Sequence, residues 1–132
     1  MLNITKQSDY GIMLISYLKN EKDFVSLSQL LKKLDLPKRF LARIAAVLVK
    51  AGVLVSREGK VGGYKITNKA KNISLYDYLK IFEGDLAFVK CQDPTYDCPR
   101  QGYCQHSAFF KYNLTNVLSK QLKKQKLLQI YK

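Results

Sequence analysis

The feature that most constrains this fold is an ordered run of two short helices within residues 26–51. Ser26 and Gln29 have the spacing of a capping box, which predicts that a helix begins directly after Ser26. Pro37 ends this helix, because proline cannot continue a helix but suits the first position of a new one. The second helix is expected from about residue 37 to residue 51, where Gly52 stops it. Two helices joined by so short a turn indicate a helix-turn-helix.

A glycine-bearing hairpin follows directly. Residues 53–57 and 64–67 have the composition of strands, and residues 58–63 form a turn that contains three glycines. A helix-turn-helix followed by such a hairpin predicts a winged helix. The expected fold class is therefore mainly α with a small β-hairpin wing, completed by a long C-terminal helix.

Basic side chains gather where a winged helix would meet DNA. Lys38, Arg39 and Arg43 lie on the first turns of the second helix, and Arg57 and Lys60 lie in the hairpin. An arginine in this position can fork onto guanine or phosphate, and wing cations can reach phosphates or the minor groove. We predict all five as DNA contacts. For the helices alone, a small helical bundle with a solvated basic face is the alternative.

The charge balance supports a polyanionic partner. The chain has a formal net charge of +13, from 23 Lys and Arg against 10 Asp and Glu. Residues 1–73 carry +9, residues 74–106 carry −2 and residues 107–132 carry +6. On charge alone this favours nucleic acid first and an anionic membrane surface second, and a merely soluble basic surface is the alternative. Together with the winged helix, it leads us to predict double-stranded DNA as the partner. No apolar run is long enough for a signal peptide or a bilayer span, so we expect a cytoplasmic protein without membrane contact.

The acidic section holds all three cysteines and the only histidine of the chain, at Cys91, Cys98, Cys104 and His106. In a reducing compartment, clustered thiols indicate metal or redox chemistry. Their gaps are wider than the Cys-x-x-Cys knuckle of most structural zinc sites, and they describe a loop around a larger object. We therefore favour an iron–sulfur cluster. A Cys3His zinc site and metal-free thiols that act as a redox switch are the alternatives.

Helical periodicity predicts further helices on both sides of these regions. One runs from about residue 5 to residue 20, one covers residues 74–83, and a long one covers residues 107–128. Residues 68–72 are expected to form a polar connector. So small a domain cannot easily bury both sides of the long helix, so we expect a homodimer. Packing of this helix onto its own winged domain is the alternative.

Short segments spread over nearly the whole chain carry a family resemblance: SDYG at 8–11, residues 36–44, GVLVSR at 52–57, GKVGGY at 59–64, ISL at 73–75, FEGD at 82–85, and the three cysteines. Together they resemble the winged-helix regulator family that includes the iron–sulfur cluster regulator IscR, the nitric-oxide sensor NsrR, the iron regulator RirA and the cysteine-metabolism repressor CymR. The wing and the cysteine loop at their mutual distance are the most specific part.

The resemblance implies a homodimeric transcription factor with one winged domain on each half of an operator. It implies that Cys91, Cys98 and Cys104 hold a 2Fe–2S or 4Fe–4S cluster, of which we favour 2Fe–2S. In the IscR branch the fourth ligand is a histidine, and His106 lies one residue closer to the third cysteine than that pattern expects. In the nitric-oxide-sensing branch an acid of the partner subunit serves instead, and Asp9 matches it. We favour His106.

Two departures concern the operator. Ala42 stands where the IscR branch often has a base-reading glutamate, and Glu58 stands where its wing has an arginine. The operator sequence of that branch is therefore not carried over to this chain.

These predictions combine into a DNA-binding repressor whose cluster senses iron–sulfur status, redox state or nitric oxide. We expect residues 1–84 to form the DNA-binding domain, residues 85–106 the cluster loop, and residues 107–132 the dimerisation helix with a basic tail. The alternative is a cluster-free or zinc-containing regulator controlled by protein or small-molecule contacts. The sequence has no phosphate-cradling loop and no paired catalytic carboxylates, so we expect neither an enzyme nor a small-molecule substrate.

Overall fold

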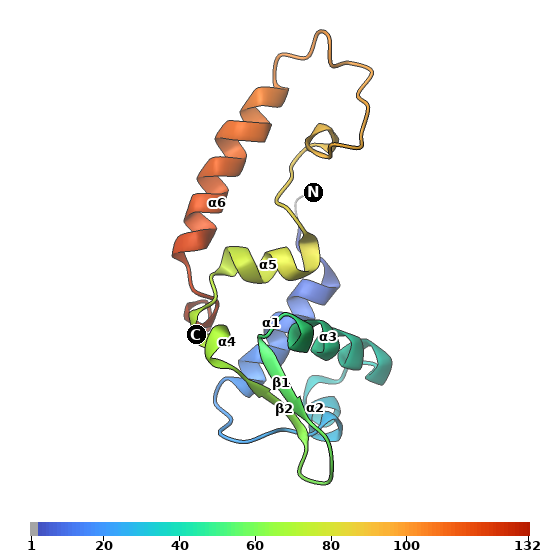
Figure 1. Cartoon of the computed structure of the whole chain (residues 1–132), viewed down its shortest axis with the longest axis vertical. Coiled ribbons are helices and arrows are strands. Elements are labelled where there is room, and N and C mark those ends of the chain that lie inside the picture. The colour runs from blue at the N-terminus through green and yellow to red at the C-terminus, as the bar shows by residue number, and fades with distance from the viewer. Residues whose placement is uncertain (1–2) are drawn as a thin grey trace.

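Three helices begin the fold in the computed structural model, which describes residues 3–132: α1 (Lys6–Leu18), α2 (Leu27–Leu34) and α3 (Lys38–Lys50) (Figure 1). Thr5 caps α1, and the predicted capping box of Ser26 and Gln29 is present at the start of α2. Asp35 has a left-handed φ of 49°, which turns the chain from α2 toward α3. The predicted end of α3 is confirmed, since Gly52 has a φ of 79° directly after the helix.

The hydrophobic core lies where α1 and α3 pack together beside the hairpin. Its fully buried side chains come from the apolar faces of these elements and, through Leu30, from α2; they are Leu14, Ile15, Leu18, Leu30, Leu41, Ile44, Leu48, Val53 and Leu54. Burial of side chains of this size contributes about 1.5–3 kcal/mol each, so this cluster stabilises the winged half of the molecule. The opposite face of α3 remains free for polar and basic residues.

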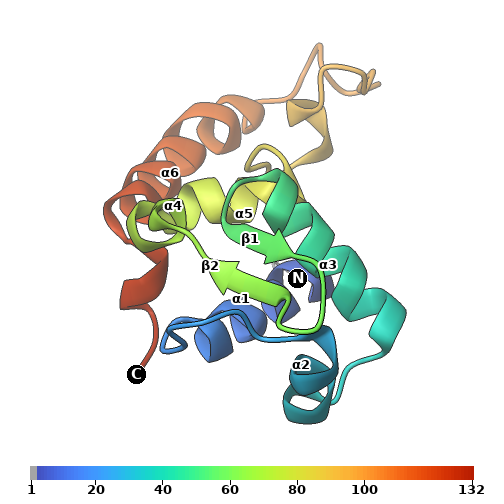
Figure 2. The same cartoon turned by 60° about the horizontal axis from the view of Figure 1, so that its bottom comes forward.

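The predicted hairpin is formed by β1 (Leu54–Arg57) and β2 (Gly63–Ile66), which are antiparallel with Arg57 opposite Gly63 (Figure 2). Val25 extends the hairpin by one antiparallel bridge to Tyr64. The Val25 N–H donates to the Tyr64 carbonyl at 2.9 Å, and the Tyr64 N–H donates to the Val25 carbonyl at 2.8 Å. Gly63 has a φ of 145°, and a Cβ there would lie 2.1 Å from the carbonyl oxygen of Val25. Only glycine therefore allows the hairpin to approach the strand before α2 this closely.

Residues 68–72, which we expected to form a connector, are instead a short helix, α4 (Asn68–Asn72). The polar composition of this segment did not indicate a helix, but two features of the structure stabilise one. The Thr67 hydroxyl accepts a hydrogen bond from the backbone N–H of Ala70 at 3.3 Å, and the Ala70 side chain is fully buried. The next helix, α5 (Leu75–Glu83), begins at Ser74 and ends before Gly84, as predicted.

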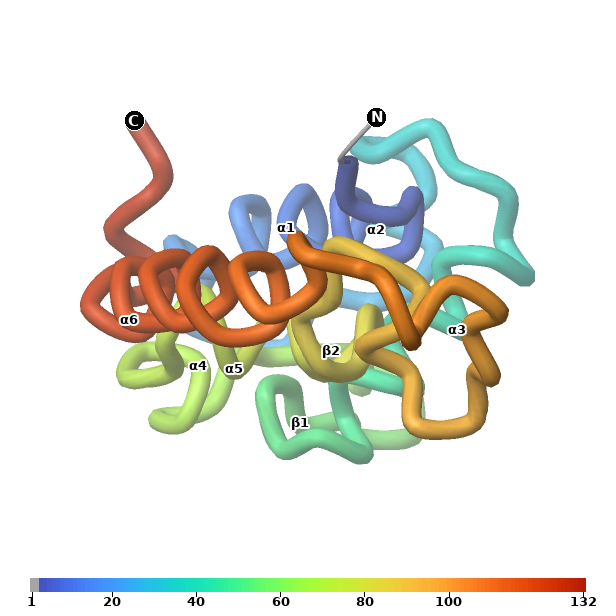
Figure 3. The backbone as a smooth tube through the Cα atoms, turned by 90° about the horizontal axis from the view of Figure 1, so that it is seen from above, coloured from blue at the N-terminus to red at the C-terminus, as the bar shows by residue number. Residues whose placement is uncertain are grey.

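The chain then leaves the winged half and forms a loop at the far end of the molecule (Figure 1). This loop contains a single 3-10 turn, η1 (Lys90–Gln92). The chain returns through a π-helical turn, η2 (Phe109–Leu114), that runs directly into α6 (Thr115–Lys124). Viewed from above, α6 lies over α5, with which it is in contact (Figure 3).

The long C-terminal helix is shorter than the predicted span of residues 107–128, because backbone pairing pulls the chain out of it after Lys124. The Leu75 N–H donates to the Gln125 carbonyl at 2.7 Å, and the Leu127 N–H donates to the Ile73 carbonyl at 3.0 Å. Leu127 is fully buried in the core and begins a last 3-10 turn, η3 (Leu127–Gln129). The C-terminal residues thus pack against the winged half.

The mainly helical architecture with one two-stranded hairpin agrees with the predicted fold class. Within residues 3–132, none of the helices combines the length and the apolar character needed to cross a membrane.

Candidate functional site

The first half of α3 presents a basic surface. Lys38, Arg39 and Arg43 are exposed, while Leu41 and Ile44 on the opposite face are buried. Arg39 and Arg43 are one helical turn apart, so both side chains project from the same side of α3. The structure therefore places Arg39 and Arg43 on one side of α3, with the exposed Lys38 next to Arg39 at the start of the helix.

The wing carries the other two predicted DNA contacts, and it reaches the end of the molecule opposite the cysteine loop (Figure 1). Lys60 is exposed in the turn between β1 and β2. Arg57 is also exposed, but its guanidinium has partners within the chain. Its Nη2 donates to the Val61 carbonyl oxygen at 2.9 Å, and its Cζ lies 4.2 Å from the centroid of the Phe24 ring.

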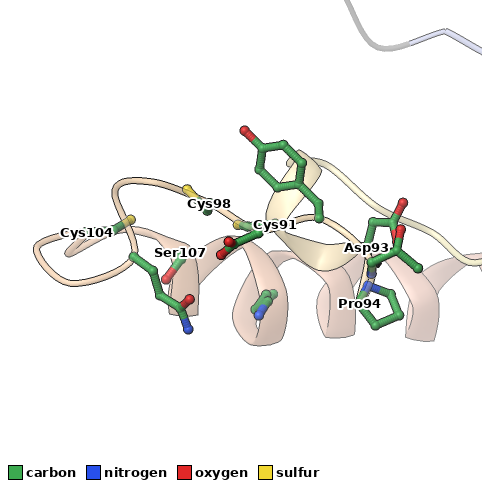
Figure 4. Close-up of a pocket in the computed structure, with 11 residues that line it drawn as sticks. Cys91, Asp93, Pro94, Cys98, Cys104 and Ser107 are labelled. Carbon is green, nitrogen blue, oxygen red and sulfur yellow. Dashed lines mark hydrogen bonds between the residues drawn. The ribbon is translucent and has the colours of Figure 1, made fainter.

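Two cavities that share lining residues lie inside the loop at the far end, and Cys91, Cys98 and Cys104 line both of them. Their volumes are about 400 and 460 Å³. All three thiols are free and half-buried. Figure 4 shows these cysteines in the loop above the long helix. The structure thus places three thiols that are separated in the sequence around the same pair of cavities.

His106 lies beside the third cysteine and lines the second cavity, with its Nδ1 3.7 Å from the Cys104 sulfur. The backbone N–H of His106 lowers the pKa of the Cys104 thiol, and hydrogen bonds from Ser107 act in the same direction against a desolvation effect. A lowered pKa favours the thiolate, which is the form that binds metals.

The structure places the remaining ligand candidate elsewhere. Asp9 is exposed in the first turn of α1 and lines neither cavity. In the described part of the chain, no three His, Cys, Asp or Glu side chains form a group that could hold a single metal ion. One subunit thus brings His106, and not Asp9, to the cysteines.

Gln92 is a residue of the site that the sequence did not reveal. Its Oε1 accepts hydrogen bonds from the backbone N–H groups of Phe88 and Val89 at 2.6 and 3.1 Å. Its Nε2 donates to Thr115 Oγ1 at 3.0 Å, and this hydroxyl donates to the Phe110 carbonyl at 2.7 Å. The residue that follows Cys91 is therefore joined to the π-helical turn and to α6.

A second set of contacts that the sequence did not reveal joins the end of α5 to the start of α1. The Glu83 carboxylate accepts hydrogen bonds from the Thr5 N–H at 2.8 Å, from the Thr5 hydroxyl at 2.9 Å and from the Ser8 hydroxyl. Desolvation alone would raise the pKa of Glu83, but these hydrogen bonds outweigh it and lower the pKa. Tyr78 adds a buried hydrogen bond from its hydroxyl to the Ser8 carbonyl at 2.8 Å.

The comparison with known families decides what kind of protein this site belongs to. Residues 4–132 match the family Rrf2, described as iron-dependent transcriptional regulator. The chain belongs to the Rrf2 family. It is therefore a DNA-binding transcriptional regulator and not an enzyme, as predicted, and the resemblance stated from its sequence segments is confirmed.

Individual relatives support this Rrf2 assignment. Protein rrf2 of Nitratidesulfovibrio vulgaris is 29% identical over 105 residues, which cover 78% of this chain and 70% of the relative. The regulator NsrR of Oceanobacillus iheyensis is 21% identical over 94 residues, which cover 70% of this chain and 64% of the relative.

Solved structures confirm the winged-helix fold of this Rrf2 chain. CymR, the global cysteine regulator of B. subtilis, aligns with a TM-score of 0.72 at 20% identity, covering 98% of this chain and 96% of CymR. T. potens IscR aligns with a TM-score of 0.62 at 21% identity, covering 98% of this chain and 85% of IscR.

Proposed function

We propose that this Rrf2 regulator is a homodimeric repressor whose operator binding depends on an iron–sulfur cluster held by Cys91, Cys98 and Cys104. The observation that carries the proposal is that all three thiols line the same pair of cavities within one loop. Thiolates are the ligands of iron–sulfur clusters, and the family description, iron-dependent transcriptional regulator, supports iron as the metal.

The surroundings of the thiols fit such a group. Lys90 and Arg100 line the second cavity, which has no acidic lining residue, so cations stand there near a centre that thiolates would make negative; the first cavity is lined by Lys111 together with Asp93 and Asp97. When bound, the cluster supplies a redox-sensitive and releasable centre that crosslinks the loop. We favour 2Fe–2S over 4Fe–4S, because ligation by both cysteine and histidine is a known arrangement for 2Fe–2S centres.

We assign His106 as the fourth ligand. Its ring nitrogen lies 3.7 Å from the Cys104 sulfur, so a small movement of the loop would let both side chains reach the same centre. Asp9 of the partner subunit is the alternative, since Asp9 lies at the exposed start of α1, where a second subunit could be contacted.

The long helix supports a homodimer through one exposed face that carries apolar side chains. Phe109 and Tyr112 of η2 and Val117 of α6 are 55%, 63% and 64% exposed, although α6 contacts α5. A second copy of the same helix would bury these side chains symmetrically. The dimer would then present two α3 helices and two wings, whose DNA contacts we assign to Lys38, Arg39, Arg43 and Lys60.

Two sets of hydrogen bonds can couple the conformation of the cysteine loop to the DNA-binding half. Gln92, next to Cys91, binds Thr115 at the start of α6. Glu83, at the end of the helix that leads into the loop, binds Thr5 and Ser8 at the start of α1. A change in loop conformation would therefore shift the dimer helix and α1, and would bias the spacing of the two α3 helices.

The first test is anaerobic purification followed by a visible spectrum and by iron and acid-labile sulfide counts per chain. We expect matching iron and sulfide in the wild type, and their loss when Cys91, Cys98 or Cys104 is changed to serine. Thr95→Ala is the matched control, because Thr95 lines the first cavity without offering a thiol. Stoichiometric zinc, or free thiols without metal under argon, would favour the alternative of a zinc-containing or cluster-free regulator.

A further inference from the structure

The tip of the wing is held by contacts within the chain. The Arg57 guanidinium donates from Nη2 to the Val61 carbonyl at 2.9 Å while its Cζ lies 4.2 Å from the Phe24 ring centroid. Lys65 Nζ, from the other strand of the hairpin, lies 5.9 Å from the same ring centroid. Cations within about 6 Å of an aromatic face are attracted by its quadrupole. Phe24 therefore holds side chains of both wing strands.

The backbone of the tip is equally constrained. The Gly62 N–H donates to the Gly59 carbonyl at 3.1 Å and closes the turn. A Cβ at Gly62 would lie 2.1 Å from the Arg57 carbonyl oxygen, so the turn folds directly onto the end of β1. The tip is thus fixed before DNA arrives, which lowers the entropy that binding would have to remove.

This fixed turn presents two side chains to solvent. Val61 is 76% exposed, and Lys60 beside it is exposed as well. A single exposed valine is ordinary on a protein surface. Here, however, its own carbonyl accepts a hydrogen bond from Arg57, so the backbone that carries its isopropyl group is held at the tip. Apolar side chains in the minor groove contact sugars and base edges, and lysines neutralise phosphates.

We infer that Arg57 is a positioning residue that fixes the wing tip, and that Lys60 and Val61 make the contacts of the wing with DNA. The inference deepens the proposed use of the wing and rests on it. It replaces the expectation that Arg57 itself contacts DNA, since this guanidinium already has a carbonyl and an aromatic ring as partners.

The test uses full-length wild-type protein and a duplex that it selects from a randomised library. Both test variants keep the net charge. Phe24→Leu removes the aromatic ring, and Arg57→Lys removes the planar guanidinium group. Phe24→Leu is expected to weaken binding about two- to fivefold, the effect of a lost cation–π contact. Arg57→Lys is expected to weaken it roughly tenfold, because it also disturbs the hydrogen bond to Val61. The double variant should bind no more weakly than the poorer single variant, because both changes remove the same contact. Wild-type affinity in both single variants would overturn the positioning role.

Amide hydrogen exchange of the free protein separates positioning of the tip from loss of the fold. Residues 58–62 should exchange faster in Phe24→Leu and Arg57→Lys, while α1 and α3 keep wild-type protection. Unchanged exchange at the tip would contradict the inference even if DNA affinity fell.

The two proposed contacts differ in their salt dependence. Lys60→Gln should reduce the slope of log affinity against log salt by about 0.9 per wing, whereas Val61→Ser should weaken binding without changing the slope. Val55→Ser is the matched control, because Val55 is 41% exposed on β1, away from the tip. Wild-type binding by both tip variants would refute the contacts. If the wild type selects no duplex, the proposed function fails, and the wing inference fails with it.

Discussion

Gln92 donates from Nε2 to Thr115 Oγ1 at 3.0 Å, which joins the residue after Cys91 to the first residue of α6. The same hydroxyl donates to the Phe110 carbonyl inside the π-helical turn at 2.7 Å. Short π segments inside helices frequently occur at functional sites. One glutamine thus links the cysteine loop to the irregular start of the helix proposed to form the dimer.

Gln92→Ala should destabilise the protein, because it leaves the backbone N–H groups of Phe88 and Val89 without their acceptor. We expect a loss of about 1–3 kcal/mol in the free energy of unfolding, measured by chemical denaturation. Gln101→Ala is the matched control, since Gln101 is an exposed glutamine of the same loop. Equal stabilities of the two variants would show that the Gln92 contacts contribute nothing.

Glu83 predicts a pH dependence of stability. Its pKa in the folded protein is lowered from the ordinary value of 4.5, because hydrogen bonds from Ser8 and Thr5 outweigh desolvation. A lowered pKa contributes stability that is present above the unfolded pKa and is lost as pH falls through the folded pKa. Glu83→Gln should therefore lower the melting temperature relative to the wild type at pH 7, and the difference should shrink toward pH 3. A difference that stays constant with pH would contradict the role of the carboxylate.

Gly63→Ala should disrupt the wing, since the added Cβ would lie 2.1 Å from the Val25 carbonyl oxygen and the φ of 145° is unfavourable for alanine. We expect a loss of about 2 kcal/mol or more in unfolding free energy, together with much weaker DNA binding. Gly102→Ala is the control, because a Cβ at Gly102 meets no atom within 4 Å. Operator titrations and thermal melts of both variants would measure the effect. Wild-type behaviour of Gly63→Ala would argue against the bridge between the wing and Val25.

Val117→Asp should convert the proposed dimer into a monomer, because it places a charge in the centre of the exposed apolar face of α6. Sedimentation at several protein concentrations measures this change directly. Asn20→Asp adds the same charge to an exposed residue after α1, outside this helix, and should leave the dimer intact. If both variants sediment like the wild type, the dimer does not use this face.

Local signals in the sequence predicted most helix boundaries, whereas contacts between distant segments were not predictable. Ser26 with Gln29, and Gly52, mark their boundaries through neighbouring atoms alone. The end of α6 depends instead on pairing between Ser74 and Lys126, which no periodicity contains. In the candidate site, cysteine and histidine can be recognised from the sequence because these residue types are common metal ligands. Gln92 does not, because an amide acquires its role only from the partners that the fold brings to it.

The central claim is that the state of the cysteine loop controls DNA binding. The most direct measurement is the affinity of reconstituted and cluster-free wild-type protein for the same selected duplex, at one fixed salt concentration under argon. We expect the two forms to differ by at least about fivefold, the lower range of allosteric coupling between two sites. A Cys91→Ser, Cys98→Ser and Cys104→Ser triple variant should match the affinity of the cluster-free form under all conditions, because it lacks the proposed cysteine ligands. Equal affinities of the reconstituted and cluster-free wild type would contradict the account.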